Sequence, residues 1–74
     1  MISFTLDYLG KKFDLQLDGK QEIQNVLKVL YESGNISYDQ EWHWCKSVLQ
    51  QRVISVYKTF DEEKIYTGDI LKFE

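Results

Sequence analysis

Proline is absent from this chain of 74 residues, which has only one cysteine, one histidine and four glycines. The single Cys45 excludes an internal disulfide, which fits a reducing compartment. A zinc site needs about four ligands, and His43 with Cys45 falls short of that set. No glycine-rich loop of the phosphate-binding type is present. We therefore expect no cofactor and no metal, and a fold stabilised by its hydrophobic core alone.

Long apolar runs and an excess of positive charge are also missing. No apolar stretch approaches the roughly 18–20 residues that cross a bilayer, and the first residues alternate in polarity, unlike a signal peptide. The net charge is −3; residues 1–37 contain four Lys against five acids, and residues 38–74 contain five Lys/Arg against seven. Without a basic patch, nucleic-acid binding is not expected. The sequence predicts a cytoplasmic protein without direct membrane insertion.

What the chain does contain is a set of large apolar side chains, with 43% hydrophobic and 15% aromatic residues. This is enough for one domain over residues 1–74. Residues 2–8 and 12–18 alternate with the period of half-buried strands, and a turn at Leu9-Gly10 would join them. The turn type stays open, because leucine is unfavourable at a positive φ. In this hairpin one face would carry the apolar pairs Ile2 with Leu17, Phe4 with Leu15, and Leu6 with Phe13.

The period changes to that of a helix between residues 20 and 33. Asp18 is predicted to cap this helix, with Gln21 as its partner in a capping box. Gly34 is predicted to end it in the left-handed conformation. Val29 lies off the apolar stripe, either as an ordinary exposed valine or as a partner contact. The stripe itself consists of Ile23, Val26, Leu27 and Leu30, with Tyr31 at its margin.

The second half of the chain predicts short elements. Residues 35–41 are expected to form a loop, residues 42–49 a strand, residues 50–52 a turn, and Val53-Ile54 a fourth strand. A short helical turn capped by Asp61 is expected to run to Lys64. After it, Ile65 is predicted to enter the core, Gly68 to form a corner, and Leu71 and Phe73 to line the inner face of the last strand. This order predicts an α+β fold, with a mixed sheet of four to five strands packed on one main helix.

The layout resembles the ubiquitin-like β-grasp fold over the whole chain. Residues 23–30 resemble the ubiquitin helix in the placement of apolar side chains, and residues 59–65 resemble the short helical turn before ubiquitin's last strand. A closer resemblance is to the YukD-like ubiquitin-like proteins of bacterial type VII secretion systems. It is based on the His43-Trp44 pair entering strand three and on the ending from Gly68-Asp69 to Phe73. Strand three departs from the aliphatic pattern of that group at Trp42, Cys45 and Ser47.

The resemblance implies a function in binding. No glycine pair follows Phe73, so a non-conjugated protein is expected. It would be an accessory or regulatory component of a type VII secretion system that binds the FtsK-like ATPase or a membrane subunit. The alternative is a small β-grasp inhibitor or adaptor protein from a mobile element, which binds and blocks an enzyme.

The candidate partner-binding surface lies on the third and last strands. If the alignment with the ubiquitin-like proteins holds, Cys45 and Ser47 point inward, and an exposed Trp44 between lysines would be an interface anchor. An alignment of this strand that is wrong by one residue would instead place Trp44 and Val48 in the core. The sequence leaves open which face of the strand points inward. The predicted partner-binding residues are Trp44, Lys46, Val48, Ile70 and Lys72.

Catalysis is not expected. His43 and Cys45 are two residues apart and would share a face of a strand, but a nucleophile also needs an activating environment and an oxyanion site. A partly buried thiol beside a surface imidazole is the simpler interpretation, and an enzyme that uses Cys45 is a third interpretation. The acidic run 61–63 lacks the glycine and spacing of a calcium loop. It is better suited to the positive end of a short helical turn.

Overall fold

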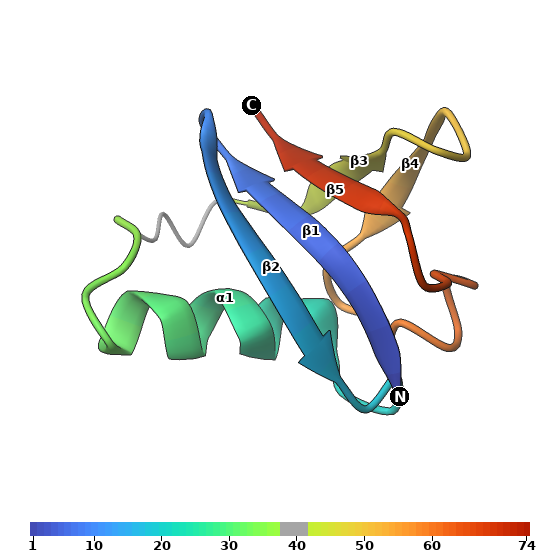
Figure 1. Cartoon of the computed structure of the whole chain (residues 1–74), viewed down its shortest axis with the longest axis horizontal. Coiled ribbons are helices and arrows are strands. Elements are labelled where there is room, and N and C mark those ends of the chain that lie inside the picture. Colours follow the sequence, from blue (N-terminus) through green and yellow to red (C-terminus); the bar gives the residue numbers. More distant parts are fainter. Residues whose placement is uncertain (38–41) are drawn as a thin grey trace.

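The computed structural model describes residues 1–37 and 42–74, which form a five-stranded mixed sheet and one helix (Figure 1). The elements are β1 (Ile2–Tyr8), β2 (Lys11–Leu17), α1 (Ile23–Glu32), β3 (Trp44–Ser47), β4 (Arg52–Ser55) and β5 (Ile70–Phe73). The strand order is β2-β1-β5-β3-β4. The pairs are antiparallel except for β1 with β5, which are parallel. The expected α+β architecture is confirmed, with α1 crossing one face of the sheet (Figure 1).

The first hairpin has the predicted register, in which Leu6 lies opposite Phe13. Its two turn residues both have positive φ, +52° at Leu9 and +91° at Gly10. This is the combination of a type I′ turn, whose twist matches that of paired strands. The Asp7 carboxylate accepts a hydrogen bond from the Gly10 amide at 3.0 Å, and the carbonyl of Phe73 accepts one from the Leu9 amide at 2.9 Å. These contacts hold Leu9 in a conformation that leucine disfavours.

The core lies between α1 and the inner face of the sheet. The helical stripe is buried as predicted, and so are Ile65, Leu71 and Phe73. At one end of the core, Trp42 meets Phe73 edge-on with ring centroids 5.5 Å apart, and its indole N–H donates to the Tyr8 hydroxyl at 2.9 Å. The buried apolar residues are Phe4, Leu6, Tyr8, Ile23, Val26, Leu27, Leu30, Ile36, Cys45, Ile54, Val56, Phe60, Ile65, Leu71 and Phe73.

The predicted start of the helix is wrong. Helix α1 begins at Ile23, and its N-cap residue Glu22 makes no side-chain capping bond. Asp18 instead closes a tight turn: its carboxylate accepts from the Lys20 amide at 3.0 Å and its carbonyl from the Gln21 amide at 3.2 Å. Aspartate supports such turns as readily as it caps helices. The chain therefore turns first and becomes helical three residues later than expected.

The first turn of α1 is capped by a distant part of the chain. The Ile23 amide donates to the carbonyl of Lys58 at 3.1 Å, and the Gln24 amide donates to the carbonyl of Val56 at 2.8 Å. These are two of the amides that a helix leaves unpaired at its N-terminus. Because the acceptors come from the segment after β4, only the folded chain supplies this cap. At the other end, Gly34 has the predicted left-handed conformation, with φ +80°.

Strand β3 is shorter than predicted, and the turn after it is shifted. Residues 48–51 form the turn and Gln51 has φ +53°, whereas Arg52 belongs to β4 and lies opposite Ser47. The Val48 amide still donates to the carbonyl of Ile70 at 2.9 Å, so the backbone beyond β3 stays attached to the sheet. The predicted loop 35–41 lies partly outside the described residues.

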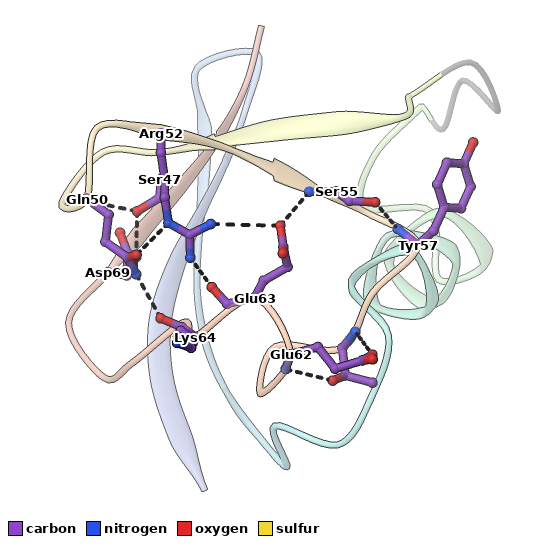
Figure 2. Close-up of polar contacts among 10 residues, drawn as sticks. Ser47, Gln50, Arg52, Ser55, Tyr57, Glu62, Glu63, Lys64 and Asp69 are labelled. Carbon is purple, nitrogen blue, oxygen red and sulfur yellow. Dashed lines mark hydrogen bonds and ion pairs between the residues drawn. The ribbon is translucent and has the colours of Figure 1, made fainter.

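The turn before the last strand has a different cap from the predicted one. The Thr59 hydroxyl accepts from the Glu62 amide and the Glu62 carboxylate accepts from the Thr59 amide, both at 3.0 Å (Figure 2). This reciprocal pair is a capping box, and its hydrogen bonds hold the pKa of Glu62 below its ordinary value. Asp61 instead lies against Gly19, where a Cβ would come within 2.2 Å of the Asp61 carboxylate. The turn ends at Lys64, which has φ +58°.

The left-handed Leu9 generates a first prediction. Leu9→Asn should raise the unfolding free energy by about 1 kcal/mol, because asparagine tolerates a positive φ. In a domain of this size that corresponds to a melting temperature higher by about 4–8 °C, measured by circular dichroism. Leu49→Asn is the matched control, since Leu49 is similarly exposed (66% against 63%) and has no positive φ. A Leu9→Asn protein that melts no higher than wild type would contradict this assignment.

Candidate functional site

The outer face of β3, β4 and β5 exposes a group of apolar and basic side chains. Along β3, Trp44 is exposed, Cys45 buried, Lys46 exposed and Ser47 buried. The exposed fraction of Trp44 is 59% and that of Val48 is 41%. This facing is one of the two that the sequence left open, and it excludes the one-residue slip. The outer patch, as it is called below, comprises Trp44, Lys46, Val48, Val53, Ile70 and Lys72.

Val53 is the member of the outer patch that sequence reasoning missed. It lies opposite Lys46 in the β3–β4 pair, and 64% of it is exposed. Its neighbour Ile54 is completely buried and lies opposite Cys45. The alternation between these two β-branched residues was visible in the sequence. Choosing which of them faces outward required the register of β4 against β3.

The predicted members on β5 contribute less exposed surface. Ile70 and Lys72 are half-buried, and Ile70 is joined to Val48 by the backbone hydrogen bond described above. The hollow that Trp44 and Val53 line has a volume of about 140 Å³. Sites for drug-sized ligands usually measure about 300–1,000 Å³. The hollow at the Trp44 end of the outer patch is therefore too small to enclose such a ligand, whereas Val48, Ile70 and Lys72 also line an open hollow of about 410 Å³ that continues onto β1 and β2.

The outer patch carries two lysines side by side. Lys46 and Lys72 lie directly opposite each other in the β3–β5 pair, an arrangement that costs free energy through repulsion of like charges. Lys72 has a solvent-exposed ion pair with Glu74 at 3.6 Å. Within residues 1–37 and 42–74, Lys46 has no ion pair. The patch thus combines an exposed indole with an unneutralised positive charge.

A buried carboxylate lies behind the outer patch. Asp69 is 1% exposed and accepts four hydrogen bonds, of which Figure 2 shows those from the side chains of Ser47 and Gln50. Two come from side chains, the Ser47 hydroxyl at 2.7 Å and the Gln50 amide at 3.3 Å. Two come from the backbone amides of Leu49 at 3.2 Å and Ile70 at 2.7 Å. Donors from three segments of the chain therefore replace the water that this charge would otherwise bind.

The hydrogen bonds continue from Gln50 to the turn that precedes β5. The Gln50 side chain donates to the carbonyl of Lys64 at 2.8 Å and accepts from Arg52 Nε at 2.7 Å. Arg52 also donates to the carbonyl of Glu63, whose carboxylate accepts from the Ser55 amide at 2.8 Å. Figure 2 shows these side chains converging between β4 and that turn. The Asp69 network, meaning Ser47, Gln50, Arg52, Glu63 and Asp69, gives the outer patch a rigid support.

The sequence contained a hint of this network. Asp69 has the same strand parity as the buried Leu71 and Phe73, and Ser47 has the same parity as the buried Cys45. Polar residues at inward positions of neighbouring strands are expected to meet, because a buried polar group needs a partner. Gln50 and Arg52 could not be placed in this way, since they lie at a turn and at its end.

Loss of the buried carboxylate should destabilise the domain strongly. Asp69→Ala leaves the Ser47 hydroxyl and two backbone amides without their acceptor, so we expect a loss of about 3 kcal/mol in unfolding free energy, measured by urea denaturation. Asp14→Ala is the control: Asp14 is exposed and accepts from the Thr5 hydroxyl at 2.8 Å. It should cost less than about 1 kcal/mol. Equal losses in the two variants would refute a special contribution from Asp69.

The two residues considered for nucleophilic chemistry have separate environments. Cys45 is 2% exposed, and burial, with smaller contributions from Glu63 and Asp69, raises its pKa to about 12. His43 is exposed, and its Nδ1 forms a hydrogen bond with the Tyr57 hydroxyl. A nucleophilic thiol needs a lowered pKa and access to solvent, the reverse of what Cys45 has. No group of three or more metal-ligating side chains occurs in the described part of the chain.

The buried thiol predicts slow chemical labelling. With a pKa of about 12, the thiolate fraction at pH 8 is roughly a thousandfold below that of an ordinary thiol. Reaction of native protein with Ellman's reagent should be slower by at least this factor than reaction in guanidinium chloride, followed by absorbance. Rapid labelling of the native protein would show that Cys45 is accessible and ionised, contrary to the structure.

Comparison with known proteins gives no assignment. No protein-family model matches the chain, and a search of curated proteins finds no match either. No helix in the described residues is long and apolar enough to cross a membrane. The properties of the outer patch are therefore the basis for a functional proposal.

Proposed function

We propose that this chain is a ubiquitin-like domain that binds another protein through the outer patch. The strand order β2-β1-β5-β3-β4, with parallel β1 and β5 at the centre and one helix across a face, supports a β-grasp fold. The resemblance of the sequence to YukD-like proteins points to the same fold.

The observation that carries the proposal is the exposure of Trp44. An indole that is 59% exposed beside the exposed Val53 leaves a large apolar area in water, which is favourable to bury. Trp44 begins β3 and lies opposite Ser55 of β4, while β5 and the Asp69 network hold the other end of the strand at Lys46 and Ser47. Little conformational entropy is lost when a side chain on such a rigid support is buried. This is the setting in which aromatic residues dominate binding energy.

The lysines define the chemistry of the partner. Burying Trp44 under another protein would also remove water from Lys46 and Lys72, which already repel each other across the β3–β5 pair. A carboxylate placed over the two ammonium groups relieves this repulsion, and a positive surface on the partner increases it. The partner surface is therefore apolar at its centre and acidic on the side that faces the lysines.

The biological setting follows from the resemblance stated above. The chain acts in the cytoplasm as an accessory or regulatory component of a type VII secretion system. Its partner is the secretion ATPase or a membrane subunit of the system. In the alternative, the chain is a β-grasp inhibitor or adaptor protein from a mobile element. Its outer patch then binds a single enzyme and blocks it. The two are separated by the identity of the bound protein.

Affinity capture from the native cell tests the proposal. Wild type should recover the secretion ATPase or a membrane subunit, and Trp44→Ala should recover at least about tenfold less, as expected when an interface anchor is lost. Tyr66→Ala is the matched control, because Tyr66 is an exposed aromatic residue (64%) outside the outer patch. Recovery that is equal for wild type and Trp44→Ala would refute the site. Specific recovery of one unrelated enzyme would support the inhibitor.

The charge of the partner is tested with the captured protein after purification. The double variant Lys46→Glu with Lys72→Glu should bind about tenfold or more weakly at low salt, and the difference should shrink as salt screens the charges. Thermal melts check that the variants remain folded. Binding that is unchanged by the double reversal would show that the lysines do not contact the partner.

A further inference from the structure

Strand β2 leaves one edge of the sheet open. It pairs with β1 alone, and its register with β1 is continuous over residues 11–17, without a bulge. In a two-residue hairpin the pair next to the turn exchanges both backbone hydrogen bonds, and bonded and non-bonded pairs then alternate along the strands. The backbone N–H and C=O groups of Lys12, Asp14 and Gln16 therefore point away from β1. An edge of this kind is a template for one more strand.

Apolar side chains lie beside the open edge. Leu15 and Leu17 are half-buried, and Val29 of α1 is 62% exposed. Together with Val26 and Leu30 they line a hollow of about 170 Å³ between β2 and the helix. A strand added at this edge would cover apolar surface as well as pair with the backbone.

The inner face of β2 is complementary to itself in the antiparallel direction. When a twofold axis passes through Leu15, this residue meets Leu15 of a second copy. Phe13 then lies opposite Leu17 of the second copy, and Leu17 opposite Phe13. All of these side chains belong to the apolar face of β2, which is half-buried in the single chain. The axis also places both α1 helices on the same side of the extended sheet, so that Val29 faces the neighbouring molecule.

The charges on the outer face of β2 are also favourable in this register. The axis at Leu15 places Lys12 opposite Asp18 of the second copy and Asp14 opposite Gln16, and symmetry repeats both pairs. Moving the axis to Asp14 would place two Asp14 carboxylates face to face, and moving it to Gln16 would place Asp14 opposite Asp18. An axis at Phe13 would pair Lys12 with Asp14, but it would place Lys11 opposite Leu15 on the apolar face. Opposite charges directly across a strand pair are favourable and like charges unfavourable. Lys12 has no ion pair within the described chain, so it is available for this contact.

We propose that the chain forms a twofold dimer in which β2 pairs antiparallel with β2 of a second copy, with Leu15 at the axis. The dimer extends the sheet at the edge away from β3 and β4, so the outer patch of both copies stays open. Because one strand pair buries little surface, the dimer is weak, with a dissociation constant on the order of 10–100 μM. The proposal does not depend on the function proposed above.

Sedimentation equilibrium of the full chain from about 5 μM to 1 mM, a range that brackets this constant, tests the dimer. Lys12→Asp and Asp18→Lys should each weaken self-association by about tenfold, since each places like charges opposite at two symmetric positions. The double variant Lys12→Asp with Asp18→Lys should restore it to within about threefold. Lys46→Asp makes the same change in net charge on β3 and should leave self-association unchanged.

Amide hydrogen exchange gives an independent measurement that does not require a variant. The amides of Lys12, Asp14 and Gln16 should exchange more slowly as protein concentration rises, because pairing occupies them. A chain that is monomeric at about 1 mM overturns the proposal, and so does a dimer that is insensitive to the single charge reversals. Loss of partner capture by Trp44→Ala with intact self-association would separate the two proposals, because the variant lies on β3.

Discussion

The buried carboxylate of Asp69 is the constraint on which the second half of the molecule depends. A charge that is 1% exposed is tolerable only if donors replace its water. Here the donors are the Ser47 hydroxyl, the Gln50 side chain and the backbone at the start of β5. Moving any of them would leave a buried group unpaired. The turn at residues 48–51 and the entry to β5 are therefore held in one arrangement, and the outer face of β3 is fixed with them.

The two faces of β3 have contrasting properties. Inward, Cys45 is packed in the core and Ser47 is fully hydrogen-bonded. Outward, Trp44 is exposed, and Lys46 lies beside Lys72 without a carboxylate partner of its own in the described chain. A second surface, the open edge of β2, lies at the other end of the strand order. The molecule thus has two separate surfaces whose apolar and charged groups another chain could satisfy.

Several local interpretations of the sequence were displaced by contacts with distant segments. Asp18 has the side chain of a helix cap, yet it closes a turn, because carbonyls of Val56 and Lys58 cap α1 instead. The Thr59–Glu62 box takes the role expected of Asp61, whose carboxylate lies against Gly19. Several residue types bond equally well at turns and at helix ends. Packing elsewhere in the chain therefore chooses between the two outcomes, and single-sequence patterns do not record that choice.

Periodicity alone was sufficient to predict the hairpin register, the buried stripe of α1 and the inward facing of Leu71 and Phe73, because the period of side chains along strands and helices is a local property. It left open whether Trp44 and Lys46 point outward, and the pairing of β3 in the assembled sheet decided that they do. Tertiary structure alone determined that Val53 joins them and that Asp69 becomes a buried acceptor. Each of these depends on the register or approach of segments far apart in the chain, and such contacts exist only once the sheet has assembled.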